Sequence, residues 1–424
     1  MKLFRNFVIL LAAVLVSAAP AFGRSLSKTE ARDEAARIWS AWCNEIANDA
    51  PYLLPELKPL AQSDTTVWII PDSLEPNAAL MFRYGTKGET TEPMPLFIYL
   101  HGSGPSVIEW ATGMKLAERF DDAPCAYFIP KIPNEGPYYR WWQKGKLFAW
   151  DKLLSQALAS GKIDPDRIYV FGISEGGYGS QRLASYLADY LAAAGPMAGG
   201  EPLINAPVEN CRNIGFSLLT GEQDLGFYRN ILTYRTSEAF KANQAESPEG
   251  DFRHRIELIP NRGHGIDYTP TTPWLSQFTR RTRPARVTWE DYDMDGVRRP
   301  GFYNLAIDER PEGSDRMFYD MTVDSAANAV DIKISLVEYR TTETDPNWGI
   351  SLKQARKFTP ATGGKITVFA DDEMLDLDKP VTVTINGRKA YKGKIDRSSE
   401  SIERSLDLFG DPRRLYPASV TLSY

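Results

Sequence analysis

Short apolar runs of strand length alternate with amphipathic segments between residues 95 and 260. A nearly continuous apolar run is typical of a strand that is buried on both faces of a sheet. The strand-like runs are PLFIYL (95–100), CAYFIP (125–130), RIYVFG (167–172), GFSLLTGEQD (215–224) and HRIELIP (254–260). The segments with helical spacing between them are 146–161, 180–195 and about 226–243. This alternation predicts an α/β fold with a doubly wound, mostly parallel sheet.

Two further regions flank this core, and a chain of 424 residues is long enough for two domains. Residues 24–90 contain one helical segment and two strand-like runs, which we expect to lead into the same domain as the core at 91–285. Helical spacing ends at RRTRPARVTWE (280–290), and short β runs then continue to the C-terminus. Residues 286–424 are therefore predicted to form a smaller all-β, sandwich-like domain.

Residues 1–23 have the pattern of a secretory signal peptide. Lys2 and Arg5 precede an apolar run at 7–16, and Ala21 and Gly23 supply the small residues of a cleavage site. The apolar run is short for a membrane span, so a retained anchor is the less favoured alternative. We expect a cleaved signal and a secreted or periplasmic protein.

Export permits disulfides, but the chain has only three cysteines, Cys43, Cys125 and Cys211. At most one pair can form, and the sequence leaves open which residues would pair. The spacing of the three thiols does not match a metal site.

The charge distribution excludes two classes of partner. The formal net charge is −6, and no block of basic residues interrupts the chain. A protein of this kind lacks the positively charged surface that binding to nucleic acid or to an anionic membrane requires.

Residues 291–296 imitate the start of an EF-hand loop, but the twelfth position is Phe302 where a bidentate glutamate is required. We expect neither a metal nor an organic cofactor.

The stretch VFGISEGGYGS (170–180) places Ser174 in a Gly-x-Ser-x-Gly frame directly after a predicted strand. In a nucleophile elbow this sharp turn raises the serine oxygen above the sheet, and small residues are needed on either side. Gly172 and Gly176 fill those positions, and further glycines follow. The alternative is a purely structural glycine-rich joint, so the rest of the chain must supply a base, an acid and an oxyanion site.

The strand at 95–100 leads directly into His-Gly-Ser-Gly at 101–104. A loop in this place gives one backbone N–H to the oxyanion hole, and the residue after the nucleophile gives the second. The predicted donors are the N–H groups of Glu175 and of Ser103, with Gly102 as an alternative to Ser103.

The acid and the base are predicted from the order of the remaining candidates. Asp224 ends a strand-like run about 50 residues after Ser174, and Glu222 and Asp267 are weaker rivals. Of the three histidines, His101 belongs to the oxyanion loop and His254 to a strand, which leaves His264 in the loop after the last strand. The order Ser174, Asp224, His264 is that of an α/β-hydrolase triad.

Residues from about 90 to 285 resemble the α/β-hydrolase superfamily. The motifs that resemble it are YLHGSG, IDPDRIYVFGISEGGYGS, PMAGGEP, TGEQD and GHG. They are most similar to those of secreted esterases related to polyhydroxybutyrate depolymerases and to feruloyl and acetylxylan esterases. The resemblance implies Ser174 as nucleophile, His264 as base and Asp224 as orienting acid. The C-terminal DLDKPVTVTINGRKAYKG also looks like the β appendage of some bacterial members.

An aromatic cluster at 138–142 follows the second predicted strand of the core, where loops build the substrate pocket. We expect His101, Arg140, Trp141 and Trp142 to contact the substrate, with Arg140 meeting a carboxylate. The alternative for the aromatic cluster is packing in the core. The predicted function is hydrolysis of a carboxylic ester, on a polysaccharide or a related substrate, through an acyl-enzyme. The ester would be acetyl, feruloyl or methyl uronate.

Two other functions fit the same residues less well. The Ser-x-Gly-Gly-Tyr elbow is also that of prolyl-oligopeptidase-type serine peptidases, although the chain lacks their large propeller. A non-catalytic carbohydrate-binding protein could have kept the fold, but it would have no need of a complete triad. Acyl and alcohol specificity, the role of the β domain and the oligomeric state are not indicated by the sequence.

Overall fold

The computed structural model of the chain describes residues 25–91 and 93–424, and the predicted signal peptide lies outside them. Its largest sheet has eight strands in the order β1-β2-β4-β3-β5-β6-β7-β8. The first two strands pair antiparallel, β2 is antiparallel to β4, and all other neighbours are parallel. The strands are β1 (Thr65–Ile69), β2 (Ala79–Lys87), β3 (Met94–Leu100), β4 (Cys125–Lys131), β5 (Ile163–Ile173), β6 (Ala193–Met197), β7 (Gly215–Gly221) and β8 (His254–Ile259). The predicted α/β-hydrolase sheet is confirmed.

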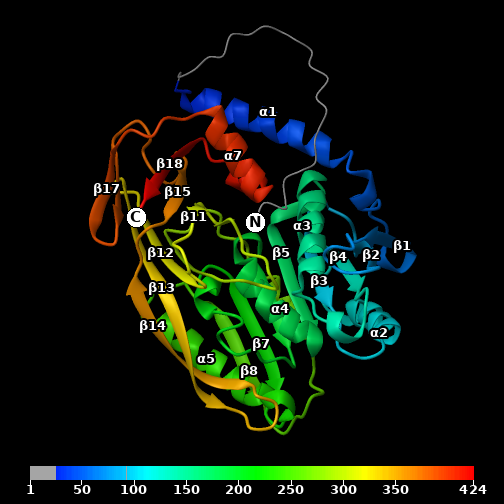
Figure 1. Cartoon of the computed structure of the whole chain (residues 1–424). Helices are drawn as coiled ribbons and strands as arrows, with labels where there is room; N and C mark the ends of the chain where they lie inside the picture. The colour runs from blue at the N-terminus through cyan, green and yellow to red at the C-terminus, as the bar shows by residue number, and fades with distance from the viewer. Residues whose placement is uncertain (1–24, 92) are drawn as a thin grey trace.

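Helices cover both faces of this sheet, as Figure 1 shows. Alternate residues of β3 enter different cores: Leu96 and Ile98 lie in one cluster, and Phe97 and Tyr99 in the other. The continuous apolar run therefore reflects a strand that is buried on both faces of the sheet. The helices are α2 (Ser106–Arg119), α3 (Lys144–Ala159), α4 (Glu175–Tyr186), α5 (Arg229–Ala245) and α6 (Thr271–Leu275).

One predicted helix is wrong in its extent. The segment 180–195 was expected to be helical throughout, but α4 ends at Tyr186 and β6 begins at Ala193. The sequence of β6 is AAGPM, which has no β-branched or aromatic residue to favour a strand. Its extended conformation comes from pairing with β5 and β7 on either side, which is a property of the assembled sheet.

The C-terminal region forms two smaller sheets. One has the order β10-β11-β15-β18, and the other has the order β17-β16-β13-β12-β9, with β14 paired to β13. All pairs are antiparallel except β13 with β16. The strands are β9 (Arg286–Asp291), β10 (Gly301–Phe302), β11 (Leu305–Glu309), β12 (Met317–Asp324), β13 (Ala329–Thr344), β14 (Ser351–Pro360), β15 (Lys365–Ala370), β16 (Val381–Ile385), β17 (Arg388–Gly393) and β18 (Ala418–Ser423).

This region also contains one helix that was not predicted, α7 (Ser399–Phe409). Ser398 caps it, because its side chain accepts a hydrogen bond from the N–H of Ser401, and Gly410 ends it in a left-handed conformation. Its apolar side packs against the N-terminal helix α1 (Lys28–Ile46) in a small separate cluster. Figure 1 shows α1 and α7 together at the top of the molecule.

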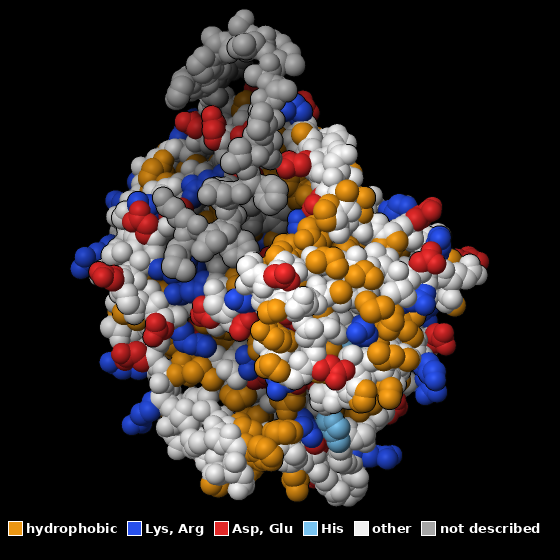
Figure 2. Space-filling model, turned by 45° about the vertical axis from the view of Figure 1, so that its right-hand side comes forward, with side chains coloured by type: hydrophobic (Ala, Val, Ile, Leu, Met, Phe, Trp, Pro, Cys, Tyr) orange, Lys and Arg blue, Asp and Glu red, His pale blue; other side chains and the backbone are white. Residues whose placement is uncertain are grey.

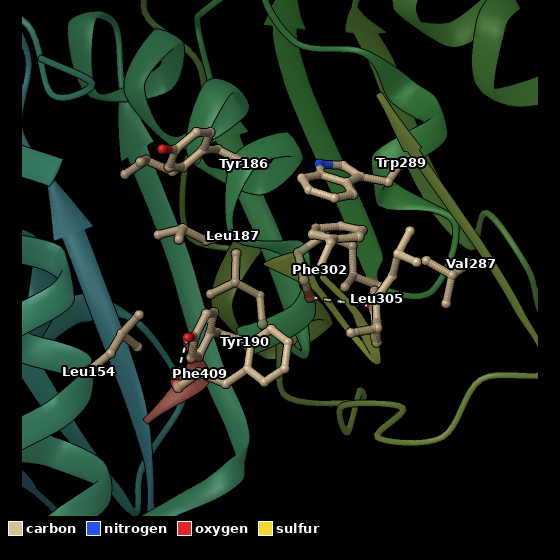
Figure 3. Close-up of a cluster of buried hydrophobic side chains, with 14 of the residues drawn as sticks. Leu154, Tyr186, Leu187, Tyr190, Val287, Trp289, Phe302, Leu305 and Phe409 are labelled. Carbon is tan, nitrogen blue, oxygen red and sulfur yellow. Dashed lines mark hydrogen bonds between the residues drawn. The ribbon is translucent and has the colours of Figure 1, made fainter. Parts of the chain in front are cut away.

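The two regions share one hydrophobic core. Figure 3 shows Tyr186, Leu187 and Tyr190 facing Phe302 and Phe409. The first three come from the region of the eight-stranded sheet, before residue 286, which we call the hydrolase region, and the last two come from the C-terminal region. The hydroxyl of Tyr190 donates a hydrogen bond to the carbonyl of Phe409 at 2.6 Å. The residue boundary near 286 stays a prediction, while buried side chains from both sides of it belong to one hydrophobic cluster.

A buried network of charges lies next to this shared core. Asp189, in the short helix η4 (Ala188–Tyr190), accepts hydrogen bonds from Arg299 and Arg414. Arg414 also binds Asp411, which accepts a hydrogen bond from Arg280 at 2.7 Å. All five side chains are buried, and the members come from both regions. Because each buried charge has an opposite partner, the network joins the regions without leaving an isolated ion in the interior.

The outer surface has a mixed charge. Figure 2 shows basic and acidic side chains interspersed over the visible face. Over the part of the chain that the structure describes, no helix has the length and apolar character needed to cross a membrane. Cys43, Cys125 and Cys211 are all free thiols.

Candidate active site

Ser174 lies in the sharp turn between β5 and α4. Its backbone has φ 57° and ψ −112°, which a residue with a Cβ rarely adopts. The turn is held by a hydrogen bond from the N–H of Ser174 to the carbonyl of Met197, at 2.9 Å, at the end of β6. This backbone strain is that of a nucleophile elbow, in which the serine side chain projects above the sheet.

The glycines around Ser174 are required by close backbone contacts. A Cβ on Gly176 would lie 1.9 Å from the carbonyl oxygen of Leu100, at the end of β3. A Cβ on Gly172 would lie 2.5 Å from the carbonyl oxygen of Gly176, and one on Gly177 would lie 2.3 Å from that of Met197. The start of α4 is therefore pressed against the ends of β3 and β6, and the steric demand predicted for these glycines is confirmed.

The structure brings Ser174, His264 and Asp224 together in one hydrogen-bonded series. The Nε2 atom of His264 lies 3.0 Å from the Oγ atom of Ser174, and its Nδ1 atom lies 2.7 Å from Oδ2 of Asp224. The carboxylate is buried, whereas the imidazole is 45% exposed. A neutral imidazole in this position would donate through Nδ1 and leave Nε2 free to accept the serine proton.

Asp224 has a second partner that the sequence analysis missed. Arg229, the first residue of α5, donates through Nε to Oδ2 at 2.9 Å and through Nη2 to Oδ1 at 2.7 Å. Burial opposes ionisation of Asp224, but the hydrogen bonds from Arg229 and His264 outweigh it and lower the pKa of the carboxyl. An arginine five residues after the candidate acid was the only signal in the sequence.

The two rival acids have other partners. Glu222 accepts a hydrogen bond from the N–H of Asn261 at 3.1 Å, and Asp267 accepts from the hydroxyl of Thr269 at 2.7 Å. Both side chains belong to exposed residues at the rim of the site. Neither contacts His264, so Asp224 is the carboxylate that the fold places on the imidazole.

The predicted oxyanion donors lie beside Ser174. Glu175 is the first residue of α4, where the N–H has no acceptor within the helix and the helix dipole favours negative charge. On the other side, a Cβ on Gly102 would lie 3.4 Å from the Cβ of Ser174, so the loop that contains Ser103 passes next to the nucleophile. The assignment of the N–H groups of Glu175 and Ser103 to the oxyanion stays a prediction.

The side chain of Glu175 is buried at the edge of the site. Burial raises the pKa of this carboxyl to about 7, although Arg140, whose Nη1 lies 3.4 Å from Oε2, favours the ionised form. Oε1 has no hydrogen-bond partner among the described residues. A carboxyl that changes charge near neutral pH therefore lies one residue from the nucleophile.

Two predicted substrate contacts are wrong. His101 is fully buried, and its Nε2 accepts a hydrogen bond from the N–H of Ile132 at 3.0 Å while Nδ1 donates to the carbonyl of Gly102 at 2.8 Å. Trp141 is also fully buried, and its Nε1 donates to the carbonyl of His101 at 3.0 Å. Neither ring is exposed, and neither lines the pocket beside the elbow.

The other two predicted contacts, Arg140 and Trp142, line a pocket of about 440 Å³ beside the elbow. The guanidinium of Arg182 lies over the ring of Trp142 at 4.0 Å from its centroid and is bound in turn by Glu201. The lining mixes aromatic, aliphatic and charged groups and also includes Glu175, Tyr178, Asn205, Phe227, Leu232, Gly349, Ile350 and Ser351. The last three residues come from the C-terminal region, which the sequence analysis had not placed at the site.

The described residues contain no group of three or more histidine, cysteine, aspartate or glutamate side chains arranged to hold a metal ion.

No family model matches the chain, and no curated protein matches its sequence. Solved structures do match. A thermostable esterase is 21% identical with a TM-score of 0.39, and the match covers 52% of this chain and 64% of that one. A ferulic acid esterase is 15% identical, with a TM-score of 0.38 and coverage of 51% and 98%. A poly(3-hydroxybutyrate) depolymerase, LpqC from Bordetella parapertussis, is 14% identical, with a TM-score of 0.36 and coverage of 51% and 88%.

Proposed function

We propose that the protein is a serine esterase that hydrolyses carboxylic esters. The observation that supports this most directly is the continuous series from Ser174 Oγ through His264 to Asp224, with distances of 3.0 and 2.7 Å. These distances are those expected between a nucleophile, its base and the group that orients the base. The strained elbow and the position of Glu175 at the start of α4 also support acyl transfer.

In the first half of the reaction, Ser174 Oγ attacks the ester carbonyl carbon and His264 Nε2 takes the hydroxyl proton. Asp224 stabilises the resulting imidazolium, and the N–H groups of Glu175 and Ser103 donate hydrogen bonds to the oxyanion. The bond from the carbonyl carbon to the alcohol oxygen then breaks. His264 gives its proton to the departing alcohol, and the acyl group stays on Ser174.

In the second half, water attacks the acyl carbon while His264 takes one of its protons. Collapse of the second tetrahedral intermediate breaks the bond to Ser174, whose oxygen regains the proton from His264. The product is the free carboxylic acid, and the enzyme returns to its starting state.

We further propose that the ester is attached to a polysaccharide or a related substrate outside the cytoplasm, as an acetyl, feruloyl or methyl uronate group. The signal-peptide pattern at 1–23 supports export. Aromatic side chains at the pocket, Trp142 and Phe227, support binding of a ring-shaped group. Sequencing the N-terminus of the exported protein tests the predicted cleavage after Gly23.

The esterase proposal is tested with Ser174→Ala, assayed on a short-chain nitrophenyl ester and labelled with a fluorophosphonate probe. We expect the substitution to abolish both turnover and labelling while the unfolding temperature stays within a few degrees. Ser276→Ala, at an exposed position after α6, is the matched control and should retain both activities. Turnover by Ser174→Ala would contradict the mechanism, and a clear preference for aminoacyl anilides over esters would favour a peptidase.

A further inference from the structure

The hairpin of β13 and β14 extends from the C-terminal region to the pocket beside Ser174. Its tip, residues 345–350, joins the two long strands, and Gly349, Ile350 and Ser351 line the pocket directly. Figure 1 shows the yellow and orange strands of this hairpin running along the hydrolase region beside α5 and β8. One wall of the cleft therefore comes from a part of the chain more than 160 residues away from the elbow.

Hydrogen bonds fix the conformation of the hairpin tip and attach it to a neighbouring loop. The side chain of Asp345 accepts hydrogen bonds from the N–H groups of Asn347 and Trp348, and the N–H of Asp345 donates to the carbonyl of Ile350 at 2.9 Å. Asp345 is 1% exposed. The amide of Asn347 donates to the hydroxyl of Tyr228 at 3.4 Å, which fastens the tip to the loop between Asp224 and α5.

At this junction two large aromatic side chains remain exposed. Trp348 is 64% exposed and Phe227 is 47% exposed, and their ring centroids lie 5.0 Å apart at an interplanar angle of 53°. Phe227 and its neighbour Tyr228 both have left-handed backbones, with φ of 52° and 57°. The backbone of both residues is therefore held in a conformation that residues with a Cβ rarely adopt. Strained backbone and exposed aromatic rings are both common at ligand sites.

The aromatic pair is connected to the candidate triad through a short series of contacts. The guanidinium of Arg229 lies 5.6 Å from the ring centroid of Phe227 and binds both oxygens of Asp224. Asp224 binds His264. Phe227 lines the pocket, and Trp348 lies against it and directly precedes the lining residue Gly349. Polar side chains of Arg140, Glu201 and Asn205 line the same pocket.

We propose that Trp348 and Phe227 form a stacking platform for a pyranose ring of the glycan that bears the ester. The C–H groups on one face of a sugar are weakly positive and bind the face of an aromatic ring, while its hydroxyls need polar partners nearby. An exposed aromatic pair beside a pocket lined with charged and amide groups supplies both. The proposal rests on the proposed function for the nature of the ester, and it makes the C-terminal region part of the substrate site.

The test measures binding separately from turnover. Ser174→Ala protein is titrated calorimetrically with xylohexaose, cellohexaose and hexagalacturonate, and the same titrations are repeated after adding Trp348→Ala or Phe358→Ala. Phe358 is the matched control, because it is an exposed aromatic residue on β14 of the same hairpin, 44% exposed and far from the tip. Unfolding temperatures establish that each variant is folded.

We expect at least one of the three oligosaccharides to bind, with a Kd raised about 10-fold or more by Trp348→Ala and left unchanged by Phe358→Ala. The proposal is overturned if none of the three binds, or if the Trp348→Ala protein binds as tightly as its parent. It is also overturned if Trp348→Ala in the active enzyme lowers turnover of ethyl ferulate and glycan binding stays unchanged, since the platform would then hold an aryl group. Failure of the esterase proposal itself would appear separately, as an absence of nitrophenyl acetate hydrolysis by the unmodified protein.

Discussion

Arg229 binds both carboxylate oxygens of Asp224, at 2.9 and 2.7 Å, and shares one of them, Oδ2, with the imidazole of His264. A bidentate guanidinium fixes the plane of a carboxylate as well as its charge. The two hydrogen bonds from Arg229 therefore orient the Asp224 carboxylate toward the imidazole, and Arg229 is a positioning residue for the candidate triad.

Replacement of Arg229 by alanine should lower kcat on a short ester about 10- to 100-fold, because the plane of the Asp224 carboxylate is no longer fixed. Burial would then act on Asp224 without its largest opposing partner, so the pKa of Asp224 should rise. The acidic limb of the pH–rate profile should shift to higher pH. Arg229→Lys, which keeps the charge and loses the bidentate geometry, should be intermediate. An unchanged pH profile in Arg229→Ala would show that the pair is only structural.

Gly176→Ala should disrupt the elbow. The added Cβ would lie 1.9 Å from the carbonyl oxygen of Leu100, so α4 must move away from β3. We expect a loss of about 3 kcal/mol in the free energy of unfolding, and almost complete loss of activity. Gly263→Ala is the matched control, because a Cβ at that position meets no atom within 4 Å, and its unfolding free energy should stay within about 1 kcal/mol. Urea denaturation measures both, and equal stability of the two variants would refute the steric argument.

Asp189→Asn should destabilise both regions together. The change removes the buried carboxylate that pairs with Arg299 and one of the two that pair with Arg414, which costs about 3–5 kcal/mol. Glu338→Gln, at an exposed ion pair with Lys357, should change the free energy of unfolding by less than about 0.5 kcal/mol. A single calorimetric transition at lower temperature is expected, and loss of only one of two separate transitions would contradict a joint core.

The same substitution should change the acid sensitivity. Burial disfavours the charged form of Asp189, but Arg299 and Arg414 outweigh it and lower the pKa of the carboxyl in the folded protein. The resulting stabilisation is complete above the ordinary aspartate pKa and is lost as the pH falls toward the lowered folded value. The wild-type protein should therefore lose more stability than Asp189→Asn when urea titrations are moved from pH 7 to pH 3. Equal losses of unfolding free energy in the wild type and in Asp189→Asn would contradict the prediction.

Glu175→Gln should change how the free energy of unfolding depends on pH in the alkaline direction, in contrast to Asp189→Asn, whose effect appears in acid. Burial raises the pKa of Glu175 to about 7 in the folded protein, so folding favours the protonated form. The stability that the protein gains from protonated Glu175 is complete below the ordinary glutamate pKa and is lost as the pH rises through about 7. Glutamine imitates the protonated carboxyl, so the variant should equal the wild type at pH 4 and exceed it by up to about 3 kcal/mol at pH 8. The exposed residue Glu118 supplies the control, Glu118→Gln, which should show no such divergence.

Much of the fold and most of the site could be predicted from local patterns. The alternation of apolar runs with helical spacing indicated the α/β sheet, because each strand is buried on both faces and each helix on one. The order of Ser174, Asp224 and His264 indicated the series of side chains that the structure brings together, because each follows a predicted strand and strand ends of a parallel sheet meet at one edge.

Other features depended on contacts between distant segments. The strand β6 has no strand propensity of its own and is extended because β5 and β7 pair with it. His101 and Trp141 were predicted to be pocket residues, but both are fully buried, and Trp141 donates a hydrogen bond to the carbonyl of His101. Burial of an aromatic side chain depends on what covers it, which neighbouring residues in the chain do not reveal.

The amino-acid sequence by itself indicated Ser174, Asp224 and His264 as the candidate triad, because short motifs and the order of the strands mark these residues. Only the tertiary structure decided that Arg229 orients Asp224 and that Trp348 lies beside Phe227 at the pocket. The physical reason is distance along the chain: the hairpin tip and the loop after Asp224 are separated by more than 100 residues, and only the packing of the two regions brings them into contact.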